Sequence, residues 1–274
     1  MEYFLEGKMI RISVVIPFYK EIGLISRAVS SVLAQRDAIR AIQFEILICN
    51  DGDYSTEEIQ KVLAKNGGDN IRILKNFGRH GPGGARNCGL EQASGDYIAF
   101  LDADDYWLEW KISNQLDQME SGCSFVATSY KFEGSDTTIA PPRLIKNGLD
   151  VFQKLGIGTS TVLMRRSLCE DVRFRDIRFC QDIDFWHRLA HLEKFKYGSV
   201  IGTFVIYSPT GSTRNKLVQL AYFWKVLKLN RVGHVDMLII IIKYSFRGVY
   251  NHYFRRMQKS NKREVNYENT QNMV

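Results

Sequence analysis

The alternation of short strand-like runs with longer amphipathic stretches is the feature that most constrains the fold. Over the first 130 residues of the 274-residue chain, runs rich in β-branched and aromatic residues are separated by stretches with helical spacing of apolar residues. The strand-like runs are RISVVIPF, FEILIC, IRIL, YIAFL and SFVATSY, and the helix-like stretches cover residues 21–35, 55–66, 83–94 and 107–120. Such alternation predicts an α/β fold built on a parallel, doubly wound sheet.

Residues 131–210 follow a less regular pattern. A proline-containing loop at 140–142 precedes a strand-like run, TSTVLMRR, a helix-like stretch at 181–191 and a β-rich run, FKYGSVIGTFVIY. We expect this region to continue the same sheet in a mixed arrangement.

The chain is predicted to divide into three parts. They are a main α/β domain at 1–212, a basic amphipathic helical segment at 213–258, and a polar tail at 259–274 whose composition predicts disorder. Within the helical segment, apolar spacing predicts two helices, at about 214–230 and 235–257.

Positive charge is concentrated near the C-terminus. The formal net charge is +7, yet residues 214–263 alone carry twelve Lys or Arg against a single acid, Asp236, so that segment is +11 and the remainder −4. Aromatic and aliphatic residues are interleaved with these cations, as in a helix at a membrane interface, where each cation near an anionic leaflet contributes about 1 kcal/mol. An anionic membrane surface is therefore the expected partner.

One alternative to this membrane interpretation is open, and a second is weak. The apolar stripe can instead pack on the main domain and leave the charges as a solvated face. Nucleic acid is not expected as a partner, because the sequence contains no helix-turn-helix, RRM or zinc-binding pattern.

Cysteine usage and hydropathy predict a cytoplasmic protein, peripheral on the inner face of the cell membrane. The five cysteines show no CxxC or Cys/His pattern and are expected to be reduced. The N-terminus carries acids early and lacks a long apolar stretch, so no signal peptide is expected. The longest apolar run, 237–242, has six residues, whereas a membrane-spanning helix needs roughly 20.

Three carboxylates follow the strand-like run YIAFL in the segment YIAFLDADDYW. Like charges this close are unfavourable unless something neutralises them. A divalent cation bridging a diphosphate would do so, because Mg²⁺ and Mn²⁺ prefer oxygen ligands and often combine few carboxylates with substrate phosphates. Asp102 and Asp104 lie on one face of an extended strand. The alternative is that Asp104 or Asp105 caps a helix beginning near Trp107.

Two further segments combine polar residues with turn or loop chemistry. EILICNDGDYSTEE ends a strand-like run in Asn50, Asp51 and Gly52, which could equally be ordinary turn residues before a helix. NFGRHGPGGARN is a glycine-rich loop with Arg79 and Arg86 ahead of a helix, so its backbone N–H groups and cations could face phosphate. By itself this loop is a weak signal, since it is neither a Walker motif nor GxGxxG.

The segment RFCQDIDFWHRLA places Asp182 and Asp184 at the start of an aromatic-rich helix. The acids could simply complement the helix dipole, with Phe185, Trp186 and Leu189 in the core. His187 is expected to be structural.

These segments, in this order, together resemble the family 2 inverting glycosyltransferases of the GT-A fold. The matching segments are SVVIPFYK for the opening strand, NDGDYST for the usual DDGSxD, GGARNCGL for the loop and helix, LDADD for the DxD motif and QDIDFWHRL for the ED-type motif. The resemblance covers residues 10–190. It implies a Rossmann-like, doubly wound mixed sheet flanked by helices, with the C-terminal helices as an appendage.

The resemblance also implies a role for individual residues. Asp51 would contact uracil or an equivalent base, Asp102 the ribose or a metal-bound water, Asp104 would ligate Mg²⁺ or Mn²⁺, and Asp182 would be the general base. The expected nucleotide-sugar-binding residues are Pro17, Tyr19, Asp51, Arg79, Gly84, Arg86, Asp102 and Asp104.

Two positions and one segment depart from the family pattern. Asn50 replaces the common first aspartate, and Gln181 replaces the glutamate before Asp182. The segment YSPTGSTRNK lacks the histidine that is usual after the last strand, which leaves a contact of Arg214 or Lys216 with the diphosphate as an open question.

The expected activity is transfer of a sugar, with inversion, from a nucleotide-diphosphate sugar to a saccharide hydroxyl. The donor is expected to be a UDP-sugar, and the acceptor a polyprenyl-diphosphate-linked saccharide in bacterial surface polysaccharide or O-antigen synthesis, by analogy with the family. A catalytically silent GT-A domain that serves as a scaffold is the main alternative. A sugar nucleotidyltransferase is disfavoured because its N-terminal glycine-rich signature is missing.

Overall fold

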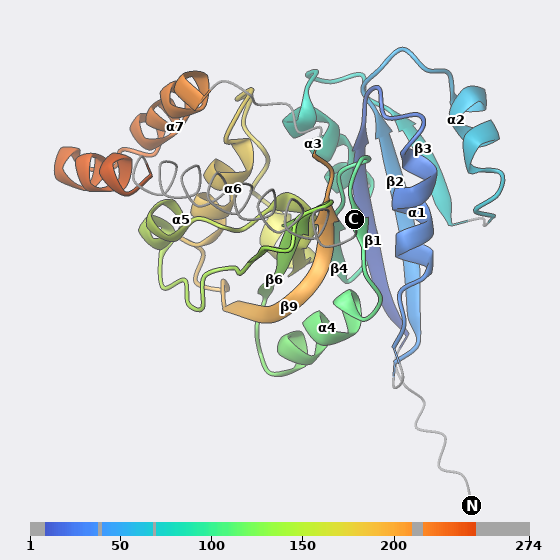
Figure 1. Ribbon diagram of the computed structural model, residues 1–274, viewed down its shortest axis with the longest axis horizontal. Coiled ribbons are helices and arrows are strands. Elements are labelled where there is room, and N and C mark those ends of the chain that lie inside the picture. Colours follow the sequence, from blue (N-terminus) through green and yellow to red (C-terminus); the bar gives the residue numbers. More distant parts are fainter. Residues whose placement is uncertain (1–8, 38–39, 68–69, 210–215, 245–274) are drawn as a thin grey trace, which may run out of the picture. The chain divides into compact units, whose positions relative to one another are not determined.

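The computed structural model describes residues 9–37, 40–67, 70–209 and 216–244 (Figure 1). These residues form two compact units, with the boundary between Val226 and Leu227. The polar tail predicted at 259–274, and most of the helix predicted at 235–257, lie outside the described residues.

The first unit contains a mixed sheet with helices on both faces. The strands are β1 (Ile10–Phe18), β2 (Ile42–Asn50), β3 (Ile71–Lys75), β4 (Tyr97–Phe100), β5 (Tyr106–Trp107), β6 (Phe125–Phe132), β7 (Thr138–Ile139), β8 (Val162–Arg165) and β9 (Tyr197–Tyr207). The helices are α1 (Ile25–Leu33), α2 (Thr56–Leu63), α3 (Pro82–Gln92), α4 (Lys111–Glu120), α5 (Gly148–Lys154), α6 (Gln181–Leu189) and α7 (Lys216–Leu229), with 3₁₀ turns at Thr159–Thr161 and Arg166–Cys169.

The strand order β3-β2-β1-β4-β8-β6-β9-β5 confirms the predicted doubly wound, mixed sheet. β3, β2, β1 and β4 are parallel, and Val14 in β1 aligns with Ile46 in β2 and with Ala99 in β4. β8 is antiparallel to both β4 and β6, whereas β9 is parallel to β6. The fifth predicted run, β6, does not pair directly with the parallel strands, because β8 lies between β4 and β6 and is antiparallel to both.

Each face of the sheet is buried under its own set of helices. Alternate residues of β1, such as Ile12, Val14 and Ile16, pack with α1, α2 and α4, while Val15 points to the other face with α3, α5 and α6. Figure 1 shows α1 and α2 alongside β1, β2 and β3. Buried side chains of both cores extend to the ends of the strands. The loops that follow those ends therefore rest on packed side chains.

The helix predicted at 107–120 begins later than expected. Trp107 belongs to β5, where it pairs with Val205 of β9, and Trp110 adopts a left-handed conformation before α4 starts at Lys111. Helix α5 was not predicted. It is short, and the Asn147 side chain caps it by accepting a hydrogen bond from the Asp150 backbone N–H.

The free cysteines and the first C-terminal helix agree with the predictions. The five cysteines are free thiols. The first C-terminal helix is α7, and helical residues resume at 234–244 within the second unit. Among the residues the structure describes, no helix combines the length and apolar character that crossing a bilayer requires.

Candidate active site

The carboxyl ends of three neighbouring parallel strands bring the predicted donor-binding residues to one edge of the sheet. Pro17 and Tyr19 lie at the end of β1, Asp51 directly follows β2, and Asp102 and Asp104 follow β4. Because β2, β1 and β4 are adjacent and parallel, these ends meet at the same edge. Ligands of open α/β sheets bind outside this edge.

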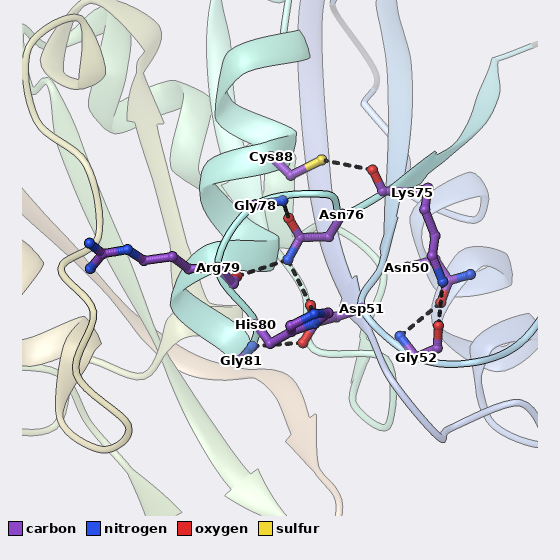
Figure 2. A network of polar contacts seen from close by, with 10 residues as sticks. All are labelled: Asn50, Asp51, Gly52, Lys75, Asn76, Gly78, Arg79, His80, Gly81 and Cys88. Carbon is purple, nitrogen blue, oxygen red and sulfur yellow. Dashed lines mark hydrogen bonds and ion pairs between the residues drawn. The ribbon is translucent and has the colours of Figure 1, made fainter.

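Asp51 is the centre of a polar network that joins β2 to the glycine-rich loop (Figure 2). Its Oδ1 accepts a hydrogen bond from Asn76 Nδ2 at 2.6 Å and lies 2.9 Å from His80 Nδ1, and its Oδ2 accepts from the Gly81 backbone N–H at 2.7 Å. The Asp51 side chain is only 8% exposed. The turn interpretation was therefore incomplete, since this carboxylate fixes the loop that leads into α3.

Two glycines allow backbone segments of this edge to approach closely. A Cβ on Gly52 would overlap the Tyr19 carbonyl oxygen, and one on Gly84 would overlap the Arg79 carbonyl oxygen. Each position therefore excludes a side chain unless the backbone moves. Gly84 acts by shaping the loop between β3 and α3.

The cations of this region point in different directions. Arg79 is 76% exposed and pairs with Asp176 at 3.0 Å, and in Figure 2 its side chain extends away from Asp51. Lys75, which the sequence motifs did not single out, donates from Nζ to the Gly52 carbonyl oxygen at 2.6 Å. Tyr19 remains at the surface, with 47% of its area exposed.

The three carboxylates of the DxD-like segment have distinct surroundings. Asp102 accepts an ion-paired hydrogen bond from Arg86 Nη2 at 2.6 Å and keeps 31% of its side chain exposed. The Asp104 backbone carbonyl accepts from Arg27 Nη2 at 2.9 Å, which anchors the backbone of this segment. Asp105 is buried, accepting from Ser160 Oγ at 2.7 Å and from the Ser208 backbone N–H at 2.9 Å.

The helix-cap interpretation of Asp104 and Asp105 is wrong. Helix α4 begins at Lys111, well after Asp105, and has no side-chain cap. Asp105 instead ties the segment to the 3₁₀ turn around Ser160 and to the end of β9. Burial, followed by the charges of Asp102 and Asp104, raises the pKa of Asp105 to about 8, although its hydrogen bonds act in the opposite direction.

The charges of Asp102 and Asp104 add to the effect of burial in raising the pKa of Asp105. Asp102 and Asp104 offer hard oxygen ligands, and Mg²⁺ or Mn²⁺ commonly binds one or two carboxylates together with phosphates and water. Among the described residues, no group of three or more His, Cys, Asp or Glu side chains forms a metal site. Two carboxylates are compatible with a cation whose remaining ligands are phosphate and water.

Asp182 lies in the first turn of α6, where Cys180 precedes the helix in a left-handed conformation. Burial of its carboxylate raises the pKa of Asp182, while the charge of Arg86 and the Ile183 backbone N–H lower it and the charge of Asp102 raises it further. Arg86, which pairs with Asp102, therefore also acts electrostatically on Asp182. Phe185, Trp186 and Leu189 are core residues, as the alternative interpretation of this segment predicted.

Asp184 has a different environment two residues along the same helix. It is completely buried, with Oδ1 2.9 Å from Arg175 Nη1 and Oδ2 3.0 Å from Arg188 Nε. His187 is structural as expected: it is buried and stacks on Phe152, with ring centroids 4.3 Å apart.

Several residues that shape the site were not predicted from the sequence. Asn87 donates to and accepts from the backbone of Phe174, at 2.9 and 2.8 Å, which ties α3 to the segment before α6. Asn76, His80 and Ser160 carry the contacts described above. Asn76 and His80 stand in the motif that the sequence did indicate, but Ser160 lies in a run that resembles an ordinary strand and gives no such signal.

Comparisons with known proteins point to one family. Residues 13–173 match the family model "Glycosyl transferase family 2". The chain is 30% identical over 256 residues to the Escherichia coli UDP-Glc:alpha-D-GlcNAc-diphosphoundecaprenol beta-1,3-glucosyltransferase WfaP, covering 91% of this chain and 98% of that protein. It is 31% identical over 196 residues to the putative teichuronic acid biosynthesis glycosyltransferase TuaG of Bacillus subtilis, covering 68% of this chain and 75% of that protein.

Solved structures show the same fold. The S. aureus TarS fragment 1-349 in complex with UDP-GlcNAc aligns with a TM-score of 0.63 at 19% identity, over 80% of this chain and 65% of that one. The mannosyltransferase PcManGT from Pyrobaculum calidifontis in complex with GDP-Man and Mn2+ aligns with a TM-score of 0.58 at 16% identity, over 87% and 70%. With its fold, motif order and full-length relatives in agreement, the chain belongs to glycosyl transferase family 2.

Proposed function

We propose that this glycosyltransferase moves a sugar, with inversion and with the help of a divalent cation, from a nucleotide-diphosphate sugar to a hydroxyl of a lipid-linked saccharide. The observation that carries the proposal is Arg86, which pairs with Asp102 at 2.6 Å and whose charge also acts on Asp182. This shared cation links the candidate base to the predicted donor site. It argues against a silent scaffold, which has no need of Asp102, Asp104 and Asp182 together.

In the proposed mechanism the donor lies along the carboxyl edge of β1, β2 and β4. Asp51, with Pro17 and Tyr19, would hold the base of the nucleotide, and Asp102 the ribose. Asp104 would hold Mg²⁺ or Mn²⁺, which supplies Lewis-acid stabilisation of the charge on the leaving diphosphate. Asp182 would take the proton from the acceptor hydroxyl as that oxygen attacks the anomeric carbon.

The loop residues support the proposed contacts with the diphosphate. Gly84 allows the start of α3 to lie close to the Arg79 carbonyl, and backbone N–H groups at the start of α3 would face the phosphates. Arg79 is exposed and would have to leave Asp176 to reach a donor.

The acceptor class is supported by the names of the relatives. WfaP, and the E. coli protein WfgD at 29% identity, are both described as acting on alpha-D-GlcNAc-diphosphoundecaprenol with UDP-Glc. We infer a UDP-sugar donor and a polyprenyl-diphosphate-linked acceptor for this chain, in bacterial surface polysaccharide synthesis. A cytoplasmic enzyme at the inner face of the membrane would meet both substrates.

A membrane surface as partner is supported by the second unit. Helical residues 234–244 expose a stripe of four apolar side chains at helical spacing, namely Val235, Leu238, Ile239 and Ile242, with exposed fractions of 73%, 61%, 39% and 46%. This stripe lies in the segment that carries the excess of cations. We therefore propose that it inserts at the interface of an anionic leaflet.

The enzymatic part of the proposal is tested by incubating purified protein with UDP-glucose, UDP-GlcNAc or GDP-mannose and a synthetic GlcNAc-diphosphate lipid. We expect UDP release that depends on acceptor and on Mn²⁺ or Mg²⁺, and Asp104→Ala should lose it. NMR of the product reports inversion or retention at the anomeric carbon. Full activity in EDTA would contradict the metal assignment, and a retained configuration would contradict inversion.

The membrane part is tested by flotation with vesicles. Binding to vesicles that contain phosphatidylglycerol should weaken with salt, because screening acts on exposed charges. The double variant Leu238→Asp, Ile242→Asp should bind more weakly, and Val218→Asp on α7 serves as the matched control. Equal binding of wild type to neutral and anionic vesicles would refute the electrostatic part.

A further inference from the structure

Arg86 lies inside the protein, between two halves of the proposed site. One half is the donor side with Asp102, and the other is the start of α6 with the proposed base Asp182. It stands in α3 and only 3% of its surface is exposed. Its Nη2 donates to Asp102 Oδ1 at 2.6 Å, and its guanidinium lies 5.6 Å from the centre of the Phe174 ring. The next residue, Asn87, holds the backbone of Phe174 through two hydrogen bonds. The position of Arg86 is therefore fixed by the packing of α3 against this segment.

The other side of the Arg86 guanidinium faces the start of α6. With the Gln181 amide turned so that its oxygen faces Arg86, that oxygen accepts from Nη1 at 3.2 Å and its nitrogen donates to the Arg178 carbonyl at 3.3 Å. Gln181 is only 8% exposed. A hydrogen-bonded path thus runs from Asp102 through Arg86 to the residue before Asp182.

Along this path two carboxylates face a single arginine. Asp102 and Asp182 are both acidic, and Arg86 is the cation that acts on Asp182. A carboxylate at position 181 would claim part of the charge of Arg86. The neutral amide in this chain accepts a hydrogen bond from Arg86 without neutralising it.

We propose that Arg86 is a positioning residue for both halves of the site, which fixes the Asp102 carboxylate for the donor and supplies the counter-charge for Asp182. Gln181 keeps that charge available to Asp182. This assignment differs from the sequence-based expectation that Arg86 binds the nucleotide sugar directly, and it rests on the proposed role of Asp182 as the base.

The electrostatic consequence can be measured in the pH dependence of turnover. Within the part of the chain that the structure describes, the charged or titratable groups that act on Asp182 are Arg86 from α3, Asp102 from the end of β4 and, next to α6 itself, the Cys180 thiol. Adding a carboxylate at 181 introduces a like charge beside Asp182 and competes for Arg86. Both effects raise the pKa of Asp182, and neighbouring charges typically move a carboxyl pKa by about one unit or more.

The experiment compares kcat–pH profiles of wild type, Gln181→Glu and Arg86→Lys, using UDP-glucose, Mn²⁺ and the GlcNAc-diphosphate lipid. In Gln181→Glu the acid limb should move upward by about one pH unit, with a small change in KM for UDP-glucose. Arg86→Lys keeps a charge but loses the forked geometry, so it should raise KM for UDP-glucose about tenfold. Arg72→Lys, which changes a surface arginine paired with Glu45, is the matched control.

The results separate this inference from the proposed function. If Asp182→Asn retains wild-type turnover, the base itself is misassigned and the proposed mechanism fails. If Asp182→Asn is inactive but the acid limb of Gln181→Glu coincides with that of wild type, the role of Arg86 is refuted. Circular dichroism and thermal melting establish folding, and Gln181→Glu, which replaces one amide nitrogen by oxygen, tests the inference even if Arg86→Lys does not fold.

Discussion

Replacing Asp105 by asparagine should make the metal-free protein less sensitive to alkaline pH than the wild type. Asp105 is 2% exposed, and burial together with Asp102 and Asp104 raises its pKa to about 8. In the unfolded chain its pKa is close to 3.9. The folded state therefore binds this proton more tightly than the unfolded state, and the free energy of unfolding falls as pH rises between these two values.

The size of the effect follows from the two pKa values. Within this window the free energy of unfolding falls by about 1.4 kcal/mol for each pH unit. The fall levels off once the pH exceeds the folded-state pKa. Between pH 6 and pH 9 the wild type should lose roughly 2–3 kcal/mol of unfolding free energy through this one group. The side chain introduced by Asp105→Asn has no such titration, and its amide oxygen can still accept from the Ser208 backbone N–H.

Urea unfolding of both proteins in EDTA, followed by circular dichroism at several pH values, measures the difference. Groups that titrate in both proteins cancel in the comparison. Glu109→Gln removes an acid whose side chain is 52% exposed and should leave the pH dependence unchanged. Parallel stability curves for wild type and Asp105→Asn would refute the reasoning, since they would mean that this carboxyl titrates alike in the folded and unfolded chain.

Three other substitutions have outcomes that the structure determines. Gly84→Ala should lower the free energy of unfolding by about 1–3 kcal/mol and weaken UDP binding in calorimetry, because the new Cβ meets the Arg79 carbonyl; unchanged stability and binding would contradict this packing. Asp182→Asn should leave UDP-glucose binding intact and lower turnover by about 10²–10⁴, and near-normal turnover would count against the base. Asp184→Asn should cost roughly 3 kcal/mol in urea unfolding, because it weakens two ion pairs of a buried carboxylate; a stability equal to wild type would contradict that structural role.

The order of strands and helices could largely be predicted, because the spacing of hydrophobic residues depends only on neighbouring positions in the chain. The β-branched runs that became β1, β2, β3 and β4 alternate with helical spacing, and their parallel pairing follows from that alternation. The neighbours of β6 could not be predicted in this way. β8 enters between β4 and β6 through contacts distant in sequence, such as Met164 with both Ile98 and Phe125.

The site was predictable only in part, for a related reason. Asp51, Asp102 and Asp104 could be located because they follow buried strands, whose ends define a binding edge. Ser160 could not, because its role consists of contacts with Asp105, with the Asp102 backbone N–H and with the Trp107 indole, all at least 53 positions away. No local pattern reports contacts of that kind.

Two aspartates in the same motif therefore need not have the same role. Asp182 and Asp184 are two residues apart on one helix, yet Asp184 is enclosed by Arg175 and Arg188, whereas Asp182 is acted on by Arg86 and Asp102. A helix turns by about 100° per residue, so two such positions point in very different directions. After β4, a similar division separates Asp102, which is partly exposed at the binding edge, from Asp105, which is buried against a 3₁₀ turn. In both places one carboxylate is held by ion pairs or hydrogen bonds of the fold, and the other is the one that we propose for chemistry.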